Sequence, residues 1–77
     1  MTKAEFLQSK EYADMVEKIK GYKKGFVFTL YYGNIPKAKA NALEIVTSNC
    51  IKDGILEVTR LGYTLQGELV EKEYRRK

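Results

Sequence analysis

The sequence predicts a small α+β domain with two layers, in which helices pack on one face of a short sheet. Three observations lead to this fold class. The chain has only 77 residues. Apolar residues recur at helical spacing in two segments, and aromatic or β-branched residues dominate the segment 26–32. The predicted order is helix, strand, helix, strand, and the sheet has two or three strands.

The length predicts one domain, residues 1–77, because a chain this short has no room for a linker and a second core. Apolar residues make up 44% of the chain and charged residues 31%, as in folded soluble proteins. Such a small domain buries about 60% of its unfolded surface, so its stability is expected to be only a few kcal/mol.

A helix is predicted from residue 3 to residue 20. Thr2 and Glu5 have the spacing of a capping box, and Gly21 provides a stop. Ser9 is an alternative cap for a separate second helix, so a break near residues 8–10 stays open. The predicted buried face contains Tyr12, Met15, Val16 and Ile19.

The next segment, residues 26–32, predicts a strand, since every residue except Leu30 is aromatic, β-branched or threonine. Alternation places two sets of side chains on opposite faces. The core-facing set is Phe26, Phe28, Leu30 and Tyr32, and the opposite set is Val27, Thr29 and Tyr31.

The turn Gly33-Asn34-Ile35-Pro36 precedes a second predicted helix, which runs from Lys37 to about Asp53. Asn34 is a candidate for the N-cap or for a position near it, and Pro36 suits the first helical turn because its missing N–H is not needed there. Gly54 is expected to end the helix in a left-handed conformation.

The C-terminal third predicts a strand over residues 55–61. Residues 63–77 remain open between a hairpin that turns at Gln66-Gly67 and a short terminal helix, because their pattern fits both. The strand, helix and strand from residue 26 onward suit a βαβ unit, whose crossover is right-handed if the strands are parallel.

Charge is concentrated in two clusters. The chain carries 14 basic and 10 acidic residues, a net charge of +4. One cluster surrounds the end of the first helix, and the other closes the chain; together they comprise Lys20, Lys23, Lys24, Arg75, Arg76 and Lys77. Without these six residues the balance is eight basic against ten acidic, a net of −2. This pattern is weaker than the continuous stripe of a dedicated DNA-binding domain.

Composition argues against catalysis. The chain contains no histidine, which removes Ser-His, Cys-His and histidine-metal sites. The single cysteine, Cys50, lies near a predicted helix C-terminus, where the dipole raises a thiol pKa, and is expected in the core. We therefore expect no enzyme activity, catalytic residue, cofactor or metal site.

The sequence has no long apolar segment at the N-terminus or elsewhere, which predicts a protein without a secretory signal or a membrane span. With one cysteine no internal disulfide can form. We expect a cytoplasmic protein without membrane contact, complete from Met1.

The turn before the second helix is a candidate anion site. Backbone amides at a helix start attract anions, and Lys37 and Lys39 occupy the first turn, where the dipole does not favour cations. The turn lacks the glycine-rich sequence of a P-loop, so ordinary surface lysines are the favoured interpretation. The six tyrosines are interpreted mainly as core or rim residues, although aromatic rings among lysines can stack on bases.

Two stretches, KGFVFTLYYGNIPKAKANALEIV and IKDGILE, resemble the short uncharacterised reading frames of conjugative and integrative elements of Gram-positive bacteria. The resemblance implies an accessory protein of a mobile element. It implies no activity and assigns no functional residue.

The sequence therefore predicts a non-catalytic accessory module that binds a protein or a second copy of itself, since a small sheet leaves open edges. The alternative is nucleic-acid binding. Its candidate contact residues are Lys20, Lys23, Lys24, Asn34, Lys37, Lys39, Arg75, Arg76 and Lys77.

Overall fold

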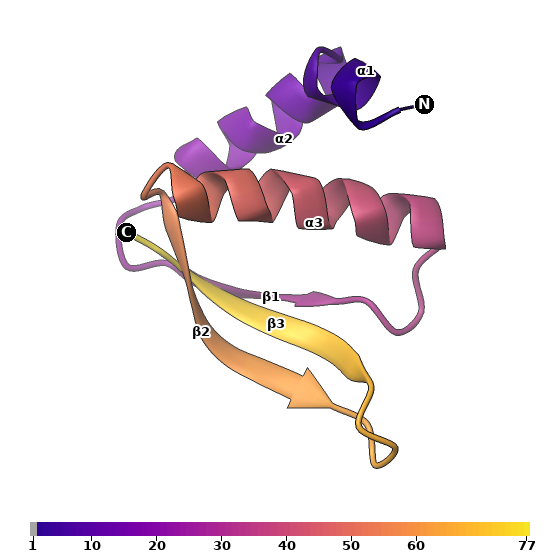
Figure 1. Ribbon diagram of the computed structural model, residues 1–77. Coiled ribbons are helices and arrows are strands. Elements are labelled where there is room, and N and C mark those ends of the chain that lie inside the picture. The colour runs from indigo at the N-terminus through magenta and orange to yellow at the C-terminus, as the bar shows by residue number, and fades with distance from the viewer. Residues whose placement is uncertain (1) are drawn as a thin grey trace.

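The computed structural model describes residues 2–77, which form three helices and three strands (Figure 1). The helices are α1 (Lys3–Leu7), α2 (Lys10–Lys20) and α3 (Lys37–Lys52), and the strands are β1 (Val27–Tyr31), β2 (Leu56–Tyr63) and β3 (Leu69–Arg76). All three helices lie on one side of the sheet, with α3 nearest to it and α2 packed on α3. The predicted α+β fold class is confirmed.

The sheet is antiparallel, with the order β1-β3-β2. β1 and β2 run in the same direction, as the βαβ prediction requires, but β3 lies between them and pairs with both. The terminal-helix alternative for residues 63–77 is wrong, and the hairpin alternative is confirmed. A physical reason is Tyr74, which is fully buried at the centre of the sheet, opposite Phe28 on one side and Val58 on the other.

The N-terminal helix is divided in two, as the Ser9 alternative allowed. Thr2 and Glu5 form the predicted capping box at the start of α1. The Ser9 hydroxyl accepts a hydrogen bond from Tyr12 N at 3.1 Å and donates one to Phe6 O at 2.6 Å. Ser9 therefore ends one helix and caps the next.

The start of α3 differs from the prediction. Pro36, and not Asn34, occupies the N-cap position, and no side chain caps this end within the described chain. Proline fits here because the cap residue is extended, with φ −57° and ψ 144°. At the other end Asp53 is the C-cap and Gly54 follows with φ +76°, as predicted.

The core lies between α3 and the sheet. Its fully buried members come from α3, β2 and β3, and are Val46, Thr47, Cys50, Leu56 and Tyr74. Phe6 and Ile19 bring α1 and α2 into the same cluster. Phe28 and Leu30 pack against it from β1, which confirms the predicted facing of that strand.

Phe26 departs from its predicted place in the core. β1 begins at Val27, and Phe26 is 46% exposed. Its N–H donates to Lys23 O at 3.0 Å, which makes it part of the turn after α2. Its ring packs on Tyr22, with centroids 4.8 Å apart.

Candidate protein-interaction surface

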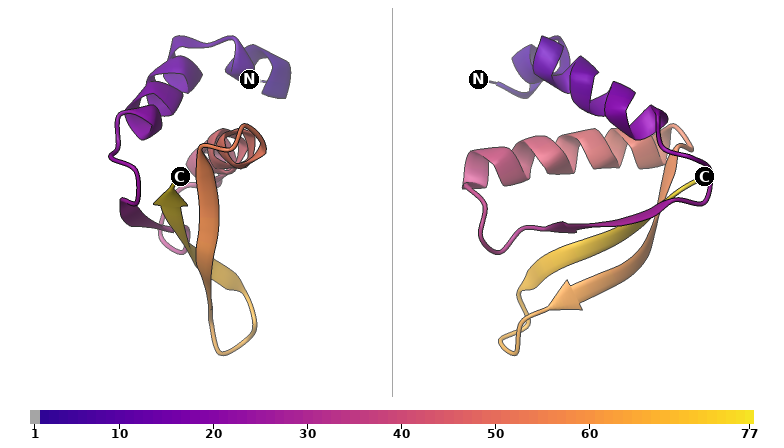
Figure 2. Two further views of the ribbon diagram at one scale, coloured as in Figure 1. Left: turned by 90° about the vertical axis from the view of Figure 1, so that its left-hand side faces the viewer. Right: turned by 180° about the vertical axis from the view of Figure 1, so that it is seen from behind.

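Residues 58–70, which we call the hairpin arm, extend beyond the layer of helices. The arm comprises most of β2, the turn and the start of β3. Both views of Figure 2 show it projecting from the sheet away from α2 and α3. Side chains on the arm therefore lack the cover that α3 gives to Leu56 and Tyr74.

The arm carries a concentration of exposed apolar side chains. Among the described residues nine large hydrophobic side chains are exposed, and five of them belong to the arm: Val58, Leu61, Tyr63, Leu65 and Leu69. Leu65, in the turn, is completely exposed. Scattered exposed apolar residues are normal, but several on one projecting element indicate an interaction surface.

The turn of the arm is closed by its own hydrogen bonds. Thr64 N donates to Glu68 O at 2.8 Å, and Gly67 N donates to Thr64 O at 2.9 Å. The Thr64 hydroxyl accepts from Glu68 N at 3.1 Å. Gly67 has φ +87°, a conformation that glycine adopts without strain. Leu65 is thus displayed on a fixed turn.

A β-bulge interrupts β2 at Thr59. The register with β3 shifts between Val58, opposite Tyr74, and Arg60, opposite Glu73. Thr59 and Arg60 both reach Glu73, with Thr59 Oγ1 donating to Oε1 at 2.9 Å and Arg60 Nε lying 3.5 Å from Oε2. The bulge therefore places two consecutive side chains on the same face of the sheet.

The face of the sheet opposite the helices is a network of ion pairs. Arg60 Nη1 lies 3.0 Å from Glu71 Oε1, and Arg75 pairs with Glu57. The hydrogen bond to Glu71, with its negative charge, raises the pKa of Arg60. Because each arginine here has a carboxylate partner, this face is not a basic platform.

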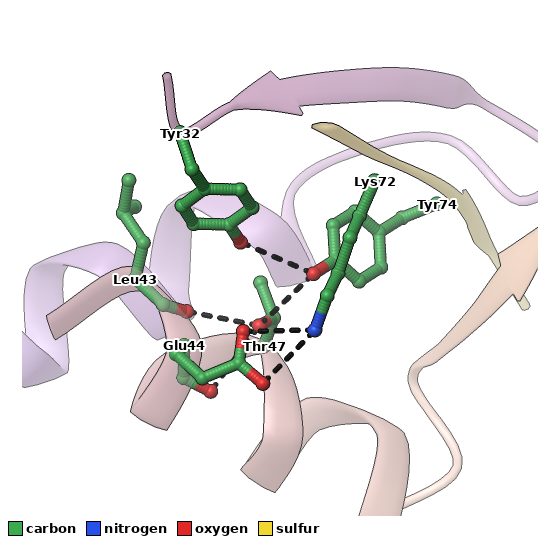
Figure 3. A network of polar contacts seen from close by, with 6 residues as sticks. All are labelled: Tyr32, Leu43, Glu44, Thr47, Lys72 and Tyr74. Atoms are coloured by element: carbon green, nitrogen blue, oxygen red, sulfur yellow. Dashed lines mark hydrogen bonds and ion pairs between the residues drawn. The ribbon is translucent and has the colours of Figure 1, made fainter. Parts of the chain in front are cut away.

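Beneath α3, a chain of hydroxyl groups links the helix to two strands (Figure 3). Tyr74 OH lies 3.2 Å from Tyr32 OH and donates to Thr47 Oγ1 at 3.3 Å. Thr47 Oγ1 donates in turn to Leu43 O at 2.9 Å. Burial, followed by the hydrogen bond with Tyr74, raises the pKa of Tyr32. These groups satisfy one another, which is typical of a structural network.

Lys72 and Glu44 close this side of the network with an ion pair. Lys72 Nζ lies 3.0 Å from both carboxylate oxygens of Glu44 (Figure 3). The side chain of Lys72 projects toward α3, so the side chain of Leu61, which lies directly opposite it on β2, also faces the helix side of the sheet.

The structure brings the two predicted basic clusters together. Gly25 N donates to Arg76 O at 2.6 Å, and Arg76 Nη2 reaches Lys20 O at 3.4 Å. The end of α2 and the end of β3 are therefore adjacent. They gather Lys20, Lys23, Lys24, Arg76 and Lys77 at one end of the molecule, and Arg75 beside them pairs with Glu57.

The predicted anion-site residues lie elsewhere. Lys37 and Lys39 lie in the first turn of α3 and Asn34 lies just before it, at the end of the helix away from the basic clusters. The 16 residues of α3 span about 24 Å. Lys39 lines a groove of about 270 Å³ between α2, β1 and α3, together with Lys18 and apolar side chains. The predicted contact residues thus form two separate groups.

The two remaining candidate features carry no evident chemistry. A shallow depression of about 630 Å³ lies between α1 and the first half of α3, lined by Phe6, Glu11 and Ile45 among others. Cys50 is buried, as predicted, and burial raises the pKa of its thiol, followed by the effect of Asp53. Both conditions disfavour a reactive thiolate.

Across residues 2–77, no group of three or more metal-binding side chains comes together. None of the helices described has the length and apolar character needed to cross a bilayer. Comparison with known proteins gives no match among family models, curated proteins or solved structures. The resemblance to accessory proteins of mobile elements stays a prediction.

The exposed apolar residues of the arm are not among the candidate site residues predicted from the sequence. A signal was present in Leu65, which stands between Gly62 and Gly67 in a segment of turn-forming residues. The exposure of Val58 and Leu61 carried no such signal, because it depends on where α3 ends over the sheet.

Proposed function

We propose that this protein is a non-catalytic module that binds another protein through the hairpin arm. The observation that carries the proposal is the concentration of five exposed apolar side chains on one projecting element. Their burial in a complex would be favourable by about 25 cal/mol for each Å² of apolar surface. β2 is also an edge strand, which can pair with a strand of the partner.

Site-specific photo-cross-linking in native cells tests the proposal. A photoreactive residue at Leu61 or Leu65 is expected to give discrete protein adducts, whereas the same residue at Ser48, exposed on α3, gives none. Competition with unlabelled protein should reduce the adducts, and competition with the Val58→Lys, Leu61→Lys double variant should reduce those at position 61 much less. Equal labelling at all three positions, or none at the arm, contradicts the proposal.

A second candidate function is nucleic-acid binding at the basic end. It is supported by the proximity of Lys20, Lys23 and Lys24 to Arg76 and Lys77, and by the half-exposed ring of Phe26 beside them. Aromatic rings among cations can stack on unpaired bases.

Binding to duplex DNA and to single-stranded RNA at two salt concentrations tests this candidate. Neutralising Z phosphates gives a slope of about −0.9Z in a log–log plot for duplex DNA and about −0.7Z for single strands. A matched pair of double variants, Lys23→Gln with Lys24→Gln and Lys37→Gln with Lys39→Gln, locates the contact. A loss of affinity only with the first pair supports the basic end; no binding at low salt rejects the candidate.

A further inference from the structure

We infer that the open edge of β2 binds the same edge of a second copy, antiparallel, with Val58 opposite Leu61 of that copy. This inference rests on the proposed function and names its partner. Three properties of β2 support it: the direction of its free main-chain groups, the faces of its side chains and the position of its bulge.

The main-chain groups of β2 that point to the open edge follow from two hydrogen bonds. Lys77 N donates to Ile55 O at 2.8 Å, so the main-chain groups of Ile55 face β3. By alternation along β2, the main-chain groups of Leu56 and Val58 point to the open edge, and those of Glu57 between them face β3. Thr64 N donates to Glu68 O at 2.8 Å, so Thr64 also faces β3. By alternation back along β2 from Thr64, the main-chain groups of Tyr63 and Leu61 point to the open edge.

The side chains of these same four residues lie on the helix side of the sheet. Val58 is opposite Tyr74, which is in the core, and Leu61 is opposite Lys72, which reaches α3. Leu56 and Tyr63 follow by alternation. Each half of the strand therefore presents two uncharged side chains on one face, with their main-chain groups directed to solvent.

The bulge makes the two halves self-complementary. Residues that are directly opposite in an antiparallel pair must project from the same face. In a regular strand Val58 and Leu61, three residues apart, project from opposite faces. The bulge places the side chains of both Thr59 and Arg60 on the face away from the helices, so Val58 and Leu61 project from the same face. A two-fold axis between Thr59 and Arg60 therefore brings Val58 opposite Leu61 and Leu56 opposite Tyr63 of the second copy.

The same feature favours a second copy over an unrelated strand. A bulge on an edge strand ordinarily discourages pairing, since a regular strand cannot follow it. A second copy carries the same bulge and meets it at the axis. The arginines nearest the axis do not oppose this, because each Arg60 is paired with Glu71 and Glu73 of its own chain.

Disulfide formation between two cysteine variants tests the register. In a hydrogen-bonded antiparallel pair the Cα atoms lie about 5.5 Å apart, within the range a disulfide spans. A mixture of Val58→Cys and Leu61→Cys proteins is expected to cross-link under mild oxidation at least tenfold more than either protein alone. The unmodified chain is a built-in control, because its Cys50 is buried.

A mixture of Val58→Cys and Tyr63→Cys proteins is the register control. These residues are two positions out of alignment, about 8–9 Å apart, and should cross-link far less. Equal cross-linking in both mixtures rejects the register.

Sedimentation over a hundredfold concentration range tests the association itself. The native chain is expected to change from monomer to dimer. The Val58→Lys, Leu61→Lys double variant should remain monomeric, and Leu65→Lys, outside the paired segment, should still dimerise. Circular dichroism verifies that each variant is folded, which is expected because these side chains are already exposed in the monomer.

The outcomes separate this inference from the proposed function. A monomer at every concentration, with adducts of a different protein at position 61, overturns the second copy and leaves the proposed function standing. A monomer without any adduct at the arm overturns both. Adducts with twice the mass of the chain, together with the 58–61 disulfide, support both.

Discussion

At the scale of single residues, Tyr74 holds the fold together. It is fully buried, its ring stacks on Phe28 with centroids 5.5 Å apart, and its hydroxyl lies between Tyr32 and Thr47. The centre of the sheet therefore depends on one side chain in two ways, through the volume of its ring and through its hydroxyl.

Two substitutions separate these contributions. Tyr74→Phe keeps the ring and leaves Thr47 bonded to Leu43 O, so it should cost about 1 kcal/mol of unfolding free energy. Tyr74→Ala should cost about 3–5 kcal/mol, because it also leaves a cavity. Urea denaturation measures both. The control, Tyr63→Phe on the exposed arm, should change stability by less than about 0.5 kcal/mol; a similar loss there would contradict the special position of Tyr74.

Cys50 predicts a pH dependence. Burial raises its thiol pKa in the folded state, so the folded protein holds the thiol proton at a pH where the unfolded chain, with a pKa near 8.5, releases it. Stability is therefore retained below about pH 8.5 and falls as the pH rises above it. The Cys50→Ala variant is expected to lose less stability than the native chain between neutral and alkaline pH in parallel denaturation curves. Identical slopes would mean that this thiol ionises equally in both states.

At the scale of secondary-structure elements, α3 carries a lysine at each end, and the helix dipole acts on the two lysines in opposite directions. Lys37 occupies the first turn, where the helix dipole disfavours a cation, and Lys52 occupies the last turn, where it favours one. Pro36 provides no side-chain cap to compensate. The start of α3 is consequently the less stable end of the element.

A matched pair of charge reversals tests this asymmetry. Lys37→Glu should stabilise the protein, and Lys52→Glu should destabilise it, each by about 0.3–1 kcal/mol at low salt. Thermal melts at low and high ionic strength are the measurement, since screening should reduce both effects. Shifts of the same sign in the two variants would show that net charge, and not the dipole, controls stability.

Local patterns in the sequence predicted the elements but not their arrangement. Helix periodicity, the Ser9 cap, Gly54 and the aromatic strand were all local signals, and they were confirmed. The place of β3 between β1 and β2 depends on pairing across more than forty residues in the case of Phe28 and Tyr74, which no short pattern encodes. The exposed arm was missed for the same reason: strand composition cannot state how far a helix covers the sheet.

At the scale of the whole molecule, the helices and the arm have different roles. The three helices cover one end of the sheet and build the core, whereas the arm has few partners of its own and exposes apolar surface (Figures 1 and 2). A domain of this size has a small core, so it gains more than a large one from covering such a surface. Association and stability should therefore be linked.

This linkage gives a test that needs only the purified protein. If two copies pair through β2, dimerisation removes folded monomer from the unfolding equilibrium, and the thermal midpoint rises with concentration. Above the dissociation constant, a hundredfold increase in concentration should raise the midpoint by roughly 5–10 °C for a domain of this length. The Val58→Lys, Leu61→Lys variant should melt at one temperature throughout, and Leu65→Lys should follow the native chain. A native midpoint independent of concentration would exclude dimerisation coupled to folding in the range measured, whatever the variants do.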